Sequence, residues 1–76
     1  MRSLIDAARS TTELTVVMHT IDFKLYVKYG THSYLHETYL ETADRLEAIS
    51  EEFANLFRLA EDKWFELENA RVLSNA

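Results

Sequence analysis

Cysteine does not occur in this sequence of 76 residues, and its absence removes several classes of site. Without a thiol the chain has no disulfide bond, no thiolate metal site and no cysteine nucleophile. A chain of this length buries only about 60% of the surface that its unfolded form exposes, so small domains commonly add disulfides, metals or oligomerisation. Oligomerisation is therefore the first expectation. The lack of cysteine also fits a reducing compartment, and we expect a cytoplasmic location.

Proline is absent as well, and Gly30 is the only glycine. Loops that cradle phosphate groups need several glycines, so a phosphate-binding loop is excluded. Because glycine and proline are the strongest interruptions of regular structure, Gly30 marks the boundary between two long ordered stretches. The sequence predicts a hairpin with its turn at 30–32.

Basic residues are few, and long apolar runs are missing. The chain has 13 acidic and 8 basic residues, for a formal net charge of −5. Such a chain repels nucleic acid and anionic lipid unless its cations cluster, and here they are scattered along the sequence. The most apolar stretch, 14–29, contains His19, Asp22, Lys24 and Lys28, and no signal peptide is visible. We expect neither nucleic acid nor a membrane as a partner.

An apolar stripe follows Gly30. Its members are separated by three, four or seven positions, which keeps them on one side of a helix: Tyr39, Leu46, Ile49, Phe53, Leu56, Ala60 and Leu67. The spacing predicts one long helix over about 33–70, with Thr31 or Ser33 as its N-cap. After Ala70 the stripe is lost, so we expect a frayed tail at 71–76.

The stretch before Gly30 fits two structures. Residues 21–29 alternate between apolar and polar side chains, as a half-buried strand does. A strand over 14–29 would be about three times the common length, and no turn residue divides it into a hairpin. We therefore predict a helix over about 13–29. Residues 4–8 form either a short separate helix or the start of one unbroken helix from about Ser3.

This first helix has two apolar faces. Leu14, Val17, Met18, Ile21 and Leu25 make one stripe, and Val16, Phe23 and Val27 lie nearly opposite. Nothing within a two-helix hairpin covers the second face, so another copy or another protein must do so. The predicted fold is all-α: an antiparallel two-helix hairpin that dimerises into a four-helix bundle.

Two histidines near the turn suggest a metal site as an alternative. His32 and His36 are four positions apart, a spacing that places both rings on one side of a helix, and Glu37 could add a ligand. The segment 30–37 resembles the one that joins the first two helices of the ferritin-like Dps proteins, in which a histidine near the second helix is an iron ligand. Leu40, one turn after His36, is no carboxylate, so iron oxidation is not carried over.

The aromatic residues divide between core and surface. Phe53, Phe57 and Trp64 follow the stripe of the long helix, whereas Phe65 lies off its centre. Tyrosines gather around the turn, and exposed tyrosine is common in interfaces. The predicted contact residues, for self-association or for another protein, are Val16, Phe23, Val27, Tyr26, Tyr34, Trp64 and Phe65.

No arrangement of residues typical of catalysis is visible. Neither a serine nor a threonine stands in a recognisable nucleophile motif, and a di-iron bundle would need Glu-x-x-His pairs that this sequence lacks. We expect no enzyme activity and no cofactor. The predicted function is a non-catalytic interaction module, an adaptor, inhibitor or assembly factor that acts as a homo-oligomer. The alternative is a metal-binding bundle that uses His32, His36 and nearby carboxylates.

Overall fold

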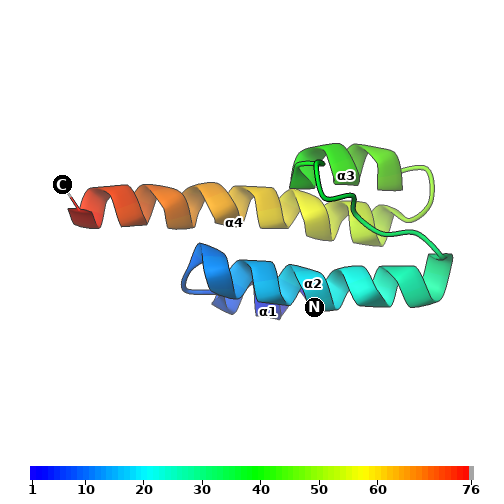
Figure 1. The fold of residues 1–76 in the computed structure, drawn as a ribbon, viewed down its shortest axis with the longest axis horizontal. Coiled ribbons are helices and arrows are strands. Elements are labelled where there is room, and N and C mark those ends of the chain that lie inside the picture. Colours follow the sequence, from blue (N-terminus) through cyan, green and yellow to red (C-terminus); the bar gives the residue numbers. More distant parts are fainter. Residues whose placement is uncertain (76) are drawn as a thin grey trace.

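The structure is a computed structural model that describes residues 1–75 of the chain, with side chains through Leu73. It contains four helices: α1 (Arg2–Ala7), α2 (Thr11–Tyr29), α3 (Tyr39–Leu46) and α4 (Glu51–Asn75). Residues 1–75 contain no strand (Figure 1). The predicted all-α class is confirmed, and the helical interpretation of 14–29 with it.

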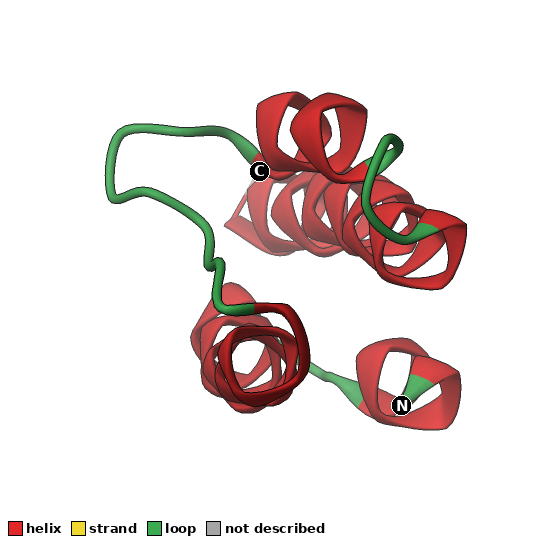
Figure 2. Ribbon diagram, turned by 90° about the vertical axis from the view of Figure 1, so that its right-hand side faces the viewer, coloured by secondary structure: helices red, strands yellow, loops and turns green. Residues whose placement is uncertain are grey.

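Helix α4 is the central element, because it is the one that packs against the other three. Helices α2 and α4 run antiparallel, and α3 lies on the other side of α4, also antiparallel to it (Figure 1). Viewed along the helix axes, α1 and α2 lie side by side beneath α4, with α3 as the outermost layer (Figure 2). The result is an elongated molecule of 42 × 19 × 19 Å.

The ends of α2 follow from its own sequence. The Ser10 hydroxyl accepts a hydrogen bond from the Glu13 backbone N–H (3.1 Å), and the Glu13 carboxylate accepts one from the Arg9 N–H (2.6 Å). The first bond satisfies a donor that a helix start leaves free, and the second ties the residue before the N-cap to the first turn. At the other end Gly30 has a φ of 72°, a left-handed conformation, and donates its N–H to the Tyr26 carbonyl. The expected interruption at Gly30 is confirmed, and α1 is a separate short helix.

The single helix predicted over 33–70 is wrong at its start. Residues 31–38 form an extended loop rather than a turn at 30–32, and α3 begins only at Tyr39. Its N-cap is Thr38, not Thr31 or Ser33. The Thr38 hydroxyl accepts from the Glu41 N–H (3.1 Å), while the Glu41 carboxylate accepts from the Thr38 N–H (3.4 Å). This reciprocal pair is a capping box, which fixes a helix start.

The predicted long helix is also interrupted in the middle. After Leu46 the chain turns, and the Ile49 and Ser50 N–H groups both donate to the Leu46 carbonyl at 2.8 Å. The Ser50 hydroxyl then accepts from the Phe53 N–H (3.4 Å) as α4 begins. This turn folds α3 back along α4, so one chain holds four helices instead of a two-helix hairpin. Helix α4 continues to Asn75, where a frayed tail was expected at 71–76, and residue 76 lies outside the described residues.

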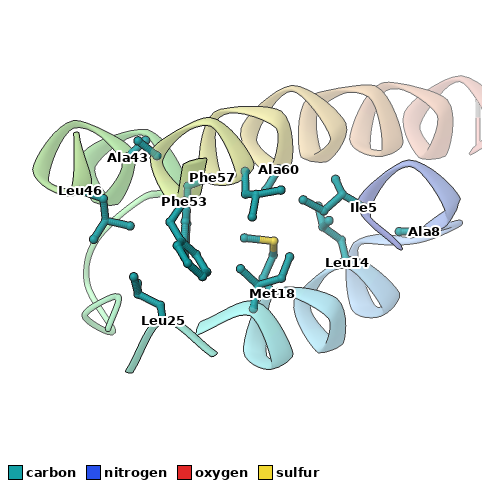
Figure 3. Close-up of a cluster of buried hydrophobic side chains, with 13 residues drawn as sticks. Ile5, Ala8, Leu14, Met18, Leu25, Ala43, Leu46, Phe53, Phe57 and Ala60 are labelled. Atoms are coloured by element: carbon teal, nitrogen blue, oxygen red, sulfur yellow. The ribbon is translucent and has the colours of Figure 1, made fainter. Parts of the chain in front are cut away.

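One apolar core joins the four helices (Figure 3). It consists of Ile5, Ala8, Leu14, Met18, Ile21, Leu25, Ala43, Leu46, Phe53, Ala54, Leu56, Phe57 and Ala60. Four members of the predicted stripe are in this core, and Tyr39 and Leu67 pack against it partly buried. Ile49 is 44% exposed because it lies in the turn between α3 and α4. A single chain therefore completes a core without a second copy.

Candidate interaction surfaces

The outward side of α2 is an apolar surface. Val16, Phe23 and Val27 are 62%, 68% and 68% exposed, although Leu14, Met18, Ile21 and Leu25 of the same helix are buried. At 100° per residue, Val16, Thr20, Phe23 and Val27 lie opposite that buried stripe. No Asp, Glu, Lys or Arg occurs among these positions. We call Val16, Thr20, Phe23 and Val27 the α2 outer face.

A shallow groove of about 380 Å³ lies beside the N-terminal end of this face. Its walls come from α1 and α2, and the residues that line it are Leu4, Ala7, Ala8, Thr12, Glu13, Val16 and Val17. Glu13 is the one charged residue among them. The groove extends the apolar surface from Val16 toward Leu4, which is itself 48% exposed.

Charged residues border the α2 outer face on one flank and are separated by sign along the helix. Glu13 stands near the start of α2, and Lys24 and Lys28 stand near its end. Positions 13, 24 and 28 project from neighbouring directions on a helix, so all three lie on the same flank. The face therefore has an acidic end and a basic end.

A second apolar surface lies on the C-terminal half of α4. Trp64 and Phe65 are 37% and 53% exposed, and their rings pack edge to face with centroids 5.3 Å apart. Arg58 lies two turns before Phe65 on the same side of α4. It forms an ion pair with Glu47 at the C-terminal end of α3 (2.9 Å). Helix α3 is only eight residues long, and α4 projects beyond it (Figure 1). Trp64 lines a shallow pocket with Thr38 and Tyr39 at the start of α3.

The seven predicted contact residues do not form one surface. Val16, Phe23, Val27 and Tyr26 are on α2, and Trp64 and Phe65 are on α4. Tyr26 is 56% exposed, and its ring lies 6.1 Å from that of His32. Tyr34 belongs to the loop, where its ring stacks under the Arg45 guanidinium at 4.6 Å. Tyr34 is 47% exposed, but that cation–π contact gives it a structural role within the chain.

Arg45 and Glu37 form the centre of a hydrogen-bonded polar site that the sequence did not reveal. Arg45 of α3 donates to both Glu37 carboxylate oxygens at 3.0 Å, to the Thr31 hydroxyl at 3.0 Å and to the His32 carbonyl at 2.6 Å. Glu37 also accepts from the Thr42 hydroxyl (3.1 Å) and the Tyr34 N–H (2.9 Å). These hydrogen bonds, led by those from Arg45, lower the Glu37 pKa from 4.5 to about 2. The site orders the loop 31–38 against α3.

The residues of the alternative metal site, His32, His36 and Glu37, are not assembled as metal ligands. Glu37 is held by Arg45, and the Tyr34 ring lies next to both histidine rings, with centroids 5.3 Å from His32 and 6.3 Å from His36. His32 Nδ1 lies 2.8 Å from the Ser33 carbonyl oxygen. Within residues 1–75, no three His, Asp or Glu side chains come together as metal ligands would. The two histidines are not on one helix, because residues 31–38 form a loop.

Comparison with known proteins does not assign this chain to a family. No protein-family description, no curated protein and no solved structure matches it. Among the helices of residues 1–75, none combines the length and the hydropathy needed to cross a bilayer. Function must therefore be argued from the surfaces themselves.

Proposed function

We propose that this protein is a non-catalytic protein–protein interaction module that acts as a homo-oligomer inside the cell. The observation that supports it is the α2 outer face. A core that one chain completes leaves Val16, Phe23 and Val27 about two-thirds exposed and without a charge among them. Large apolar patches on a soluble protein mark interaction sites, because covering them removes nonpolar area from water.

The two surfaces suit two kinds of contact. The α2 outer face is the proposed surface for self-association, since it runs along most of a straight 19-residue helix. The pair Trp64 and Phe65 is the proposed contact for another protein, because tryptophan and phenylalanine are enriched at the centres of such interfaces. With four helices in each chain, the proposed homodimer holds an α2 pair at its centre rather than the simple four-helix bundle expected from a hairpin.

Solution mass tests self-association directly. We expect sedimentation of the wild-type protein to show a concentration-dependent dimer, and Phe23→Ser to shift it to monomer. Burying one Phe side chain stabilises a contact by roughly 1.5 to 3 kcal/mol. Losing that free energy corresponds to at least about a tenfold weaker association. The helical circular dichroism of the variant should be unchanged, since Phe23 lies outside the core.

Leu35→Ser is the matched control. Leu35 is fully exposed in the loop, away from the α2 outer face, so its replacement removes a similar apolar side chain without touching the proposed contact. We expect the control to associate as the wild-type protein does. A wild-type chain that stays monomeric at every accessible concentration would contradict the homo-oligomer.

A further inference from the structure

The pattern of charge and side-chain size on α2 specifies how a second copy sits on it. Val16 and Val27 are equidistant from the point between Ile21 and Asp22, and so are Thr20 and Phe23. A twofold axis through that point, perpendicular to the helix, places each valine opposite the other valine of the second copy. It also places each Phe23 opposite a Thr20. The face is therefore complementary to itself in one orientation, as an isologous dimer contact requires.

We propose that two copies of this chain pack through their α2 outer faces with the two helices antiparallel, an inference that rests on the proposed function. In this arrangement Val16 lies against the partner's Val27, and Phe23 lies level with the partner's Thr20 across the seam between the helices. The short threonine side chain leaves room for the ring, and the match of large with small occurs twice because of the symmetry.

The charges select the antiparallel orientation. In a twofold antiparallel helix pair the same flank of each helix meets its counterpart, so Glu13 lies near the partner's Lys28, and Lys28 near the partner's Glu13. A parallel twofold pair would instead bring opposite flanks together, and in register Glu13 and the partner's Lys28 would lie about 22 Å apart along the axis. Opposite charges attract at short separations, and only the antiparallel pair brings Glu13 close to the partner's Lys28.

The groove between α1 and α2 supports the same orientation. Its apolar walls include Leu4 and Val16, and Glu13 is the charged residue beside them. An antiparallel second copy brings the end of its own α2 to this groove. The partner's Lys28 would lay its methylene chain along the apolar wall and direct its ammonium group to Glu13, the usual placement of a lysine at an apolar border.

Cysteine pairing measures the orientation, because the natural chain contains no cysteine. We would prepare Val16→Cys and Val27→Cys separately, then oxidise each alone and the two mixed. Antiparallel packing places residue 16 of one chain opposite residue 27 of the other, so the mixture should give the mixed disulfide at several times the yield of either symmetric product. Two copies of residue 16 would be about 16 Å apart along the axis, beyond disulfide reach.

Each outcome of the pairing experiment is informative. Efficient symmetric disulfides from each variant alone, with a dimeric solution mass, would overturn the antiparallel arrangement and leave self-association standing. A monomeric mass with no disulfide above the level of a Val16→Cys and Leu35→Cys mixture would overturn the proposed function as well. Circular dichroism of every variant confirms that the chain is folded.

Charge reversal gives an independent test of the same arrangement. Lys28→Glu places like charges together at both symmetric contacts, and we expect the dimer dissociation constant to rise by about tenfold at low salt. Added salt should reduce the difference. Arg2→Glu makes the same change in net charge on α1 and should leave the dissociation constant unchanged. Equal effects of the two reversals would overturn the pairing of Glu13 with Lys28.

Discussion

At the scale of single residues, Glu37 is the group that holds the loop between α2 and α3. Its two carboxylate oxygens accept hydrogen bonds from the Arg45 guanidinium. They also accept one from the Thr42 hydroxyl and one from the Tyr34 N–H. Its side chain is only 12% exposed, so these bonds are partly shielded from water. The loop 31–38 carries no regular hydrogen-bonding pattern of its own, and this cluster, with the bond from the Ser33 N–H to Asp22 (2.7 Å), orders it.

This cluster predicts how stability depends on acidity. The Glu37 pKa is lowered from 4.5 to about 2 in the folded chain, chiefly by its hydrogen bonds from Arg45. The folded state therefore favours the ionised carboxylate. The contribution is fully present above about pH 4.5 and is lost as the pH falls toward 2. Urea unfolding of the wild-type protein between pH 6 and pH 2.5 should show this loss.

Glu37→Gln isolates the effect. With solvent screening allowed for, we expect it to lower the free energy of unfolding by about 1 to 2 kcal/mol at neutral pH. It should also flatten the acid dependence. Asp62→Asn, which changes an exposed acid of α4, serves as the control and should be close to neutral. If both variants kept the wild-type pH profile, Glu37 would not be the group responsible.

At the scale of helices, boundaries are set by short polar motifs and by one glycine. Ser10, Thr38 and Ser50 each accept a hydrogen bond from the N–H three residues later, at the starts of α2, α3 and α4. Gly30 ends α2 in the left-handed region. These helix caps and the glycine determine where the chain turns, and the turns determine which helices pack together.

Gly30 offers the sharpest test of a boundary. A Cβ at this position would meet no atom within 4 Å, so replacing the glycine strains only the backbone at its φ of 72°. We expect Gly30→Ala to lower the free energy of unfolding by about 1 kcal/mol, whereas Gly30→Asn should lower it less because asparagine tolerates this region. Urea denaturation of both variants measures the difference. Equal losses would show that φ at residue 30 is not what matters.

At the scale of the whole molecule, the buried apolar residues stabilise the fold, whereas the exposed ones are the proposed contact for association. Phe53 is 3% exposed and its ring meets that of Tyr29 edge to face, with centroids 5.9 Å apart, so it joins α4 to the end of α2. Val16, Phe23 and Val27 of the α2 outer face, by contrast, are about two-thirds exposed. Replacements in the two sets should therefore separate folding from association.

Phe53→Asp should abolish folding and association together. It puts a charge into the centre of the core, where burial without a partner is prohibitive. Phe53→Ala, the milder replacement, should still lower the free energy of unfolding by about 3 to 5 kcal/mol. Thermal unfolding followed by circular dichroism measures both. A folded Phe53→Asp protein with wild-type helical content would show that the core is not organised around this ring.

Several features of this fold were predictable because they depend on neighbours in the sequence. The helix over 14–29 and the interruption at Gly30 were expected, and so was the exposed side with Val16, Phe23 and Val27. Helical spacing puts residues on faces before any tertiary contact forms. The Thr38 and Glu41 capping box was equally readable, since its four-residue pattern is local, but it was missed.

Other features depended on the three-dimensional arrangement. Ile49 continues the apolar stripe from Leu46 to Phe53, so periodicity alone favours an unbroken helix through the turn at 47–50. Arg45 meets Glu37 because α3 lies against the loop. Trp64 is 37% exposed at the edge of a shallow pocket beside the start of α3, although it follows the stripe. The sequence by itself determined which side of each helix is apolar, since that follows from local geometry. Only the tertiary structure decided which of those sides are covered, because covering depends on where the chain turns back and how far each neighbouring helix reaches.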